Sequence, residues 1–223
     1  MGGCKVIICP GNGCTSIRRS NWYGQLYEEL RALKIDVVCE NFPDPFEAKR
    51  SVWLPYIESL GADENSILVG HSSGAQAALR YAETHKLKAV VLVSATFTDL
   101  GDAGERASGY YPQGIYPSTL QAWCRVRYQE TCVRVGDFIC RSDVCYDIHG
   151  SGEENPYEFE AMKRNCACWH QFHSDDDPFI PLHEAERIRD GLGLTDTYYM
   201  LAGRSHFFEP FSELTELVVS IAN

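Results

Sequence analysis

The chain has 223 residues, of which 44% are hydrophobic and 23% are charged, a composition typical of a globular protein of ordinary size. Thirty-one acidic residues against twenty Lys and Arg give a formal net charge of −11, which repels phosphate backbones and anionic lipid surfaces. We therefore expect no nucleic-acid and no membrane partner. The first apolar run, residues 6–9, stops at Pro10 and is too short for a signal peptide or a membrane span, so we expect a cytoplasmic protein.

Apolar, β-rich segments alternate with helical patterns along most of the chain, which predicts an α/β fold with a mostly parallel sheet and helices on both faces. Strands are expected at residues 5–9, 36–40, 67–69, 89–95, 166–172 and 197–201. Helices are expected at residues 22–33, 47–60, 73–85 and 182–192, and in a closing segment with Ser212 as N-cap. Pro55 is expected to kink or interrupt the second of these helices.

The ten cysteines do not indicate a disulfide framework. Cys9, Cys39, Cys166 and Cys168 fall in expected strands and are more simply interpreted as buried thiols. Cys166 and Cys168 are two residues apart on one expected strand and so face the same side of the sheet. No second C-x-x-C and no histidine pair at zinc-binding spacing accompanies them, so we predict no metal site.

Residues 70–74 read Gly-His-Ser-Ser-Gly, a G-x-S-x-G motif between the apolar run 67–69 and a helical stretch of small residues. In a strand, sharp turn and helix, this motif acts as a nucleophile elbow that exposes the serine hydroxyl. The sequence therefore predicts Ser72 as a covalent nucleophile. The alternative is a Gly/Ser turn between a buried strand and a helix.

A serine nucleophile needs a base within hydrogen-bond reach and a carboxylate that orients the base, and in one common fold the chain order is Ser, acid, His. Asp177 follows the fifth expected strand and precedes Pro178, which restricts its turn, so it is the predicted acid. Asp176 is the second choice and Asp99 the third. His206 is the histidine that follows the last expected strand, and it is the predicted base.

The oxyanion formed by attack of Ser72 needs two preorganised donors. We predict the backbone N–H of Ser73, at the start of its helix, and that of Asn12 in the loop Pro-Gly-Asn-Gly at residues 10–13. The competing interpretation of this loop is a phosphate cradle, but it lacks a third glycine at dinucleotide-binding spacing and a Walker lysine.

Several ordered blocks lie outside residues 113–154: PGNG at 10–13, WYG at 22–24, PDP at 43–45, WLP at 53–55, GHSSGA at 70–75, RYAETH at 80–85, VLVSA at 91–95, DLGD and ERASGY at 99–110, and DDPF at 176–179. Together they resemble the retinoblastoma-binding protein 9 family of small serine hydrolases. The resemblance implies an α/β-hydrolase-like three-layer sandwich and a Ser-His-Asp triad, whose motif positions fall on Ser72, Asp177 and His206.

The chain departs from that family at four places, one of which is the insertion at residues 113–154, which has no counterpart in it. Ser205 precedes His206 where the family usually has glycine, and His173 replaces a glycine before the acidic loop. The L-x-C-x-E motif associated with binding of retinoblastoma-type pocket proteins reads here Leu60, Gly61, Ala62, Asp63, Glu64. Alanine stands in place of cysteine, so this stretch does not support a retinoblastoma-type pocket protein as a partner.

Residues 113–154 break the alternation of strands and helices, with four cysteines, several arginines and only short apolar runs. We expect one domain over residues 1–223, with this atypical insertion in the position where such hydrolases accept a cap. The alternatives are a cap over the site, a surface excursion of little order, and a segment foreign to the mature product.

The predicted activity is that of a cytoplasmic serine hydrolase, without a cofactor, which cleaves small carboxylic esters through an acyl-enzyme on Ser72. Amides and thioesters are further candidate substrates. The alternative is a non-catalytic protein-binding module on a hydrolase scaffold, because a fold does not fix a function.

Overall fold

The computed structural model describes residues 4–112, 133–135, 138–141, 144–147 and 155–223. The chain divides into two compact units. The first holds the chain up to Phe97 together with Glu158–Asn223, and the second is Thr98–Tyr157.

The first unit is built on a six-stranded sheet in the order β2-β1-β3-β4-β8-β9, and every pairing in it is parallel. The strands are β1 (Lys5–Cys9), β2 (Asp36–Val38), β3 (Ser66–His71), β4 (Ala89–Val93), β8 (Trp169–Ser174) and β9 (Tyr198–Leu201). Because parallel strands need crossover connections, a helix lies between most consecutive strands. The predicted α/β architecture is confirmed.

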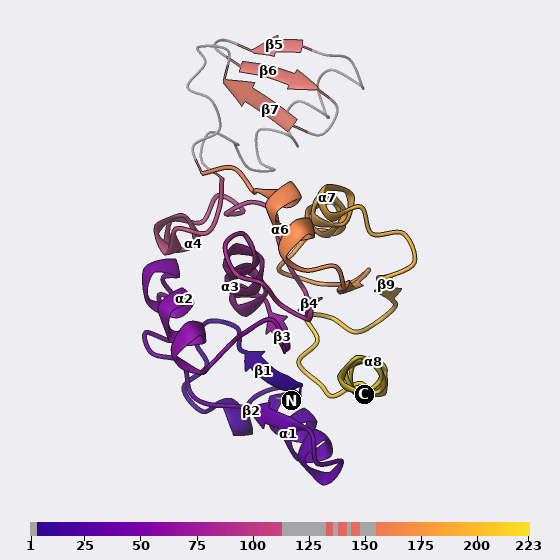
Figure 1. Cartoon of the computed structure of the whole chain (residues 1–223). Coiled ribbons are helices and arrows are strands. Elements are labelled where there is room, and N and C mark those ends of the chain that lie inside the picture. The colour runs from indigo at the N-terminus through magenta and orange to yellow at the C-terminus, as the bar shows by residue number, and fades with distance from the viewer. Residues whose placement is uncertain (1–3, 113–132, 136–137, 142–143, 148–154) are drawn as a thin grey trace. The chain divides into compact units, whose positions relative to one another are not determined.

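Helices cover both faces of this sheet, which makes three layers (Figure 1). One face carries α1 (Tyr23–Ala32) and α8 (Ser212–Ala222). The other carries α2 (Arg50–Ser59), α3 (Ser73–Ala82), α6 (Phe159–Asn165) and α7 (Leu182–Leu192).

The central strands β1, β3 and β4 are buried on both faces, which explains their nearly continuous apolar sequences. Alternate residues point to opposite sides. Val6, Ile8, Val69 and their neighbours of the same parity pack in one cluster with Leu26 of α1 and Leu214 of α8. This packing fixes the register of the strands and therefore the relative positions of the loops that follow them.

Several local expectations require correction. Cys39 follows β2, which ends at Val38, and does not lie on the strand. Cys166 closes α6, a helix that the sequence did not predict, and Cys168 precedes β8, so neither cysteine lies on a strand. Ser212 is the first residue of α8, and Phe211 is the N-cap. Pro55 does not interrupt the second helix, which runs from Arg50 to Ser59 and begins later than expected.

The second unit contains α4 (Ala103–Ser108), whose N-cap Asp102 accepts hydrogen bonds from the N–H groups of Gly104 and Glu105. A separate antiparallel sheet consists of β5 (Val133–Val135), β6 (Phe138–Arg141) and β7 (Val144–Asp147). These strands pair with one another and not with the six-stranded sheet. Most of the expected insertion at residues 113–154 lies outside the described residues.

Candidate active site

The predicted site residues of the first unit gather at one edge of the parallel sheet, where the carboxyl ends of its strands meet. Ser72 follows β3, Asp177 follows β8 and His206 follows β9. In open α/β sheets this edge is where ligands bind. All three side chains belong to the first unit.

Ser72 has the strained backbone of a nucleophile elbow, with φ 54° and ψ −120° between the end of β3 and the start of α3. Two glycines permit the turn. A Cβ on Gly74 would collide with the Cys9 carbonyl oxygen, and one on Gly70 would lie 2.5 Å from the Gly74 carbonyl oxygen. The N–H of Ser72 donates to the Val93 carbonyl at 3.0 Å, which holds the turn against β4.

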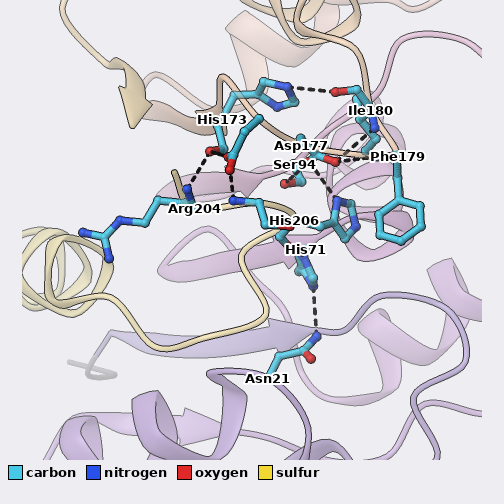
Figure 2. Close-up of polar contacts among 12 residues, drawn as sticks. Asn21, His71, Ser94, His173, Asp177, Phe179, Ile180, Arg204 and His206 are labelled. Atoms are coloured by element: carbon cyan, nitrogen blue, oxygen red, sulfur yellow. Dashed lines mark hydrogen bonds and ion pairs between the residues drawn. The ribbon is translucent and has the colours of Figure 1, made fainter. Parts of the chain in front are cut away.

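Asp177 and His206 form a hydrogen-bonded pair, with 2.8 Å between Oδ2 of Asp177 and Nδ1 of His206 (Figure 2). The Asp177 side chain is fully buried and the His206 side chain is 8% exposed. An ionised carboxylate can only accept, so Nδ1 of His206 carries the proton. In the neutral ring, Nε2 therefore has a free lone pair, as a general base requires.

Both carboxylate oxygens of Asp177 accept two hydrogen bonds each. The Ser94 hydroxyl donates to Oδ2 at 2.9 Å, and the N–H groups of Phe179 and Ile180 donate to Oδ1 at 2.9 and 3.0 Å. Burial by itself raises the pKa of Asp177, but the hydrogen bond and charge of His206, with these backbone donors, outweigh burial and lower the pKa. Asp177 is therefore held as an anion.

Asp176 and Asp99, the other candidate acids, have different partners. Asp176 accepts from the Ser174 hydroxyl at 2.6 Å and from the Ser205 N–H at 2.8 Å, so it ties the turn before His206 to β8. Asp99 lies in the second unit, where its carboxylate pairs with Arg106 at 2.7 Å. Neither makes the hydrogen bond to His206 that Asp177 makes.

His71, the residue before Ser72, contacts His206. Nε2 of His71, the neighbour of Ser72, lies 2.9 Å from the carbonyl oxygen of His206, and the two imidazole rings are 4.9 Å apart between centroids. Within the described part of the chain, the Ser72 hydroxyl makes no hydrogen bond to His206. Catalytic hydrogen bonds are often long in the absence of substrate and shorten when substrate binds.

The first loop lies against the nucleophile. A Cβ on Gly11 would lie 3.3 Å from the Cβ of Ser72, and the exposed Asn12 is the next residue. Ser73 is the first residue of α3, where backbone N–H groups have no partner from the preceding turn. Of the two predicted oxyanion donors, Ser73 is thus the next residue after Ser72, and Asn12 is the next residue after Gly11, which lies against Ser72.

The structure accommodates both family departures near the acid and the base. Ser205, the residue before His206, has φ 50°, in the left-handed region that favours glycine. His173 is buried in β8 with Nε2 3.1 Å from the Ile180 carbonyl oxygen, so it holds the loop that contains Asp177. Burial lowers the pKa of His173, which favours the neutral ring.

Two aromatic side chains flank the ring of His206. Phe179 and Phe208 are 58% and 44% exposed, and their ring centroids lie 5.1 and 5.4 Å from that of His206. No sequence motif marks either phenylalanine, or Ser94, as a functional residue. Their positions depend on loops that follow three different strands.

None of the helices formed by the described residues combines the length and the apolar character that crossing a bilayer requires. The described residues contain no cluster of three or more His, Cys, Asp or Glu side chains placed to hold a metal ion.

Comparison with known proteins identifies the family. The sequence matches the Alpha/beta hydrolase family over residues 6–214. Serine hydrolase RBBP9 of Rattus norvegicus is 36% identical over 220 residues, which cover 97% of this chain and 95% of the rat protein. The ydeN gene product from B. subtilis superposes with a TM-score of 0.66 at 18% identity, over 98% of both chains. A Paleococcus ferrophilus monoacylglycerol lipase superposes with a TM-score of 0.58 at 20% identity, over 99% of this chain and 95% of the lipase. These two solved structures share the fold of this chain. The family match and the 36% identity to the rat protein show its family: the chain is an alpha/beta hydrolase that belongs with the RBBP9-like serine hydrolases.

Proposed function

We propose that this protein hydrolyses small carboxylic esters through an acyl-enzyme on Ser72, with Asp177 and His206 completing a catalytic triad. The observation that carries the proposal is the buried 2.8 Å hydrogen bond between Asp177 and His206, beside a serine in elbow geometry. Such a pair fixes the tautomer of the imidazole and stabilises its cation.

In the proposed mechanism, Nε2 of His206 takes the proton of the Ser72 hydroxyl as the oxygen attacks the ester carbonyl. The backbone N–H groups of Asn12 and Ser73 stabilise the oxyanion. His206 then returns the proton to the leaving alcohol, which departs and leaves the acyl-enzyme. Water, activated by His206, releases the acid and restores Ser72.

The leaving group is the part of the substrate that receives a proton from His206, so it lies beside that ring. Phe179 and Phe208 contact the same ring and present exposed apolar surface there. Together with the net charge of −11, this surface favours uncharged, apolar leaving groups over anionic ones. Amides and thioesters with such groups are further candidates.

The second candidate function is a protein-binding module without catalysis. Binding a protein does not require an anionic Asp177 that is hydrogen-bonded to His206, whereas hydrolysis does require this pair. Turnover separates the two functions, because a binding module does not hydrolyse an activated ester faster than its unfolded chain does.

The test replaces Ser72 by alanine and measures hydrolysis of a p-nitrophenyl ester. The matched control is Ser220→Ala on the exposed side of α8, where the hydroxyl donates to the Leu217 carbonyl. We expect Ser72→Ala to lower kcat on the order of a thousandfold or more, while Ser220→Ala retains it. Equal turnover by wild type and Ser72→Ala would exclude the proposed mechanism.

A further inference from the structure

His71 is a buried imidazole in the middle of the candidate site, and the triad leaves it unused. Its side chain lies between two polar groups, at opposite edges of the ring. Figure 2 shows it next to His206, with Asn21 on its other side. Nδ1 is 2.5 Å from the Tyr23 hydroxyl, and Nε2 is 2.9 Å from the carbonyl oxygen of His206. Asn21 lies farther away, with Nδ2 3.5 Å from Nδ1.

The donors and acceptors around Tyr23 fix the protonation of His71. The Tyr23 oxygen accepts one hydrogen bond from the Gly11 N–H and one from Nδ2 of Asn21, each at 3.0 Å. Both of these groups can only donate, so the hydroxyl hydrogen of Tyr23 points to Nδ1 of His71. Nδ1 is therefore the acceptor, and the single ring proton sits on Nε2, from which it is donated to the His206 carbonyl.

The electrostatic environment supports the same protonation state. Burial and the nearby His206 lower the pKa of His71 to about 3, so the ring is neutral at physiological pH. Burial raises the pKa of Tyr23, so the phenol keeps the proton that it donates. Trp22 and Tyr23 pack edge-on or tilted against the imidazole, at 5.9 and 5.7 Å between centroids, and limit its rotation.

These hydrogen bonds form one continuous connection between two parts of the proposed machinery. It runs from Gly11, in the loop that contacts Ser72, through Tyr23 and His71 to the backbone of His206. We propose that His71 is a positioning residue: it sets the place of His206 relative to Ser72 and couples it to the first loop, which holds the proposed oxyanion donor of Asn12. This inference rests on the proposed function.

Only an imidazole fits this position without rearrangement. The site needs an acceptor at one edge and a donor at the other, in a neutral and planar side chain of this size. A misplacement of about 1 Å between reacting groups can lower a rate by about a hundredfold. Loss of the connection should therefore act on the chemical step far more than on substrate binding.

The first experiment compares Tyr23→Phe with Tyr27→Phe in the full-length protein. Both tyrosines are buried on α1, but the Tyr27 hydroxyl accepts from Arg31 on the same helix and lies outside the connection. For p-nitrophenyl ester hydrolysis, we expect Tyr23→Phe to lower kcat by about 10- to 100-fold, with KM changed by less than about threefold. Tyr27→Phe should keep both values. A kcat of Tyr23→Phe equal to that of Tyr27→Phe overturns the inference.

Two substitutions of His71 separate the edges of the ring. The amide nitrogen of glutamine reaches about as far as Nε2, whereas that of asparagine reaches only as far as Nδ1. We expect His71→Gln to retain at least about tenfold more kcat than His71→Asn, because it can still donate to the His206 carbonyl. The opposite order, or equal values in two folded variants, contradicts the proposed role.

A spectroscopic measurement reads the proton directly in the unaltered protein. In ¹⁵N NMR spectra of the imidazoles, His71 should show a protonated Nε2 and an unprotonated Nδ1, without titration between about pH 5 and 8. A proton on Nδ1 would refute the assignment. Failure of the proposed function has a different signature, namely Ser72→Ala as active as wild type, so the two outcomes are distinguishable.

Discussion

The substitution Asp177→Asn tests the proposed triad through a specific change of tautomer. Oδ1 of Asp177 accepts two backbone N–H groups, from Phe179 and Ile180. An asparagine at position 177 must place its carbonyl oxygen where Oδ1 was. The amide NH₂ in that place would face the two backbone N–H groups, and none of these donors would have an acceptor. Its NH₂ group then takes the place of Oδ2 and points at Nδ1 of His206.

That orientation reverses the proton distribution of the imidazole. A donor at Nδ1 selects the tautomer with the proton on Nε2, so His206 cannot accept the proton of Ser72. The expected loss in kcat is about 10⁴-fold, or roughly 5.5 kcal/mol at about 1.36 kcal/mol per factor of ten, with little change in KM. The Ser94 hydroxyl can rotate to accept from the new NH₂, so the folded structure should survive.

The assay is steady-state hydrolysis of a p-nitrophenyl ester by Asp177→Asn, with Asp176→Asn as the matched control. Asp176 is the adjacent carboxylate, and it accepts from Ser174 and Ser205 rather than from His206. We expect the control to lose less than about tenfold in kcat. A loss of about 10⁴-fold in Asp176→Asn, or less than about tenfold in Asp177→Asn, would refute the assignment of the acid.

Three further predictions concern stability and substrate choice. Because the pKa of Asp177 is lowered in the folded state, its carboxylate stabilises the fold above its ordinary pKa of about 4 and loses this contribution as the pH falls through the folded value. The difference in Tm between wild type and Asp177→Asn should therefore shrink below about pH 4. A difference in Tm that stays constant with pH contradicts this. Gly74→Ala should lower the free energy of unfolding by about 2 kcal/mol or more in urea titrations, since its Cβ would collide with the Cys9 carbonyl, and an unchanged midpoint contradicts this. Phe208→Ala should raise KM by about threefold or more for esters of aromatic alcohols, relative to methyl esters of the same acid, and equal effects on both contradict the proposed leaving-group contact.

The sequence predicted the parts of the fold that depend on local patterns. Residues 67–69 and 89–95 are nearly continuous apolar runs, as central parallel strands require. The first run lies within the buried strand β3, and the second holds the buried strand β4, which ends at Val93, two residues earlier than expected. The elbow at Ser72 follows from small residues at fixed spacing. Asp177 and His206 were predicted from chain order, and the structure brings these two side chains into hydrogen-bond contact.

The interactions that the sequence did not reveal join residues far apart in the chain. Ser94 and Asp177 are separated by 83 residues, and His71 and His206 by 135. No local pattern marks such pairs, because the sheet order decides which loops meet. The helix α6 was missed for a local reason: it has seven residues and one buried side chain, Met162, too few to show a helical period.

The most direct test of the account is to identify the residue that becomes covalently modified. Wild-type protein is treated with a fluorophosphonate, and the adduct is located by mass spectrometry of the digested chain. We predict one adduct per molecule, on Ser72, and its loss in the folded variant His206→Ala. Hydrolysis of an activated ester by a protein that carries no adduct on Ser72, or an adduct that forms equally well without His206, would contradict the account.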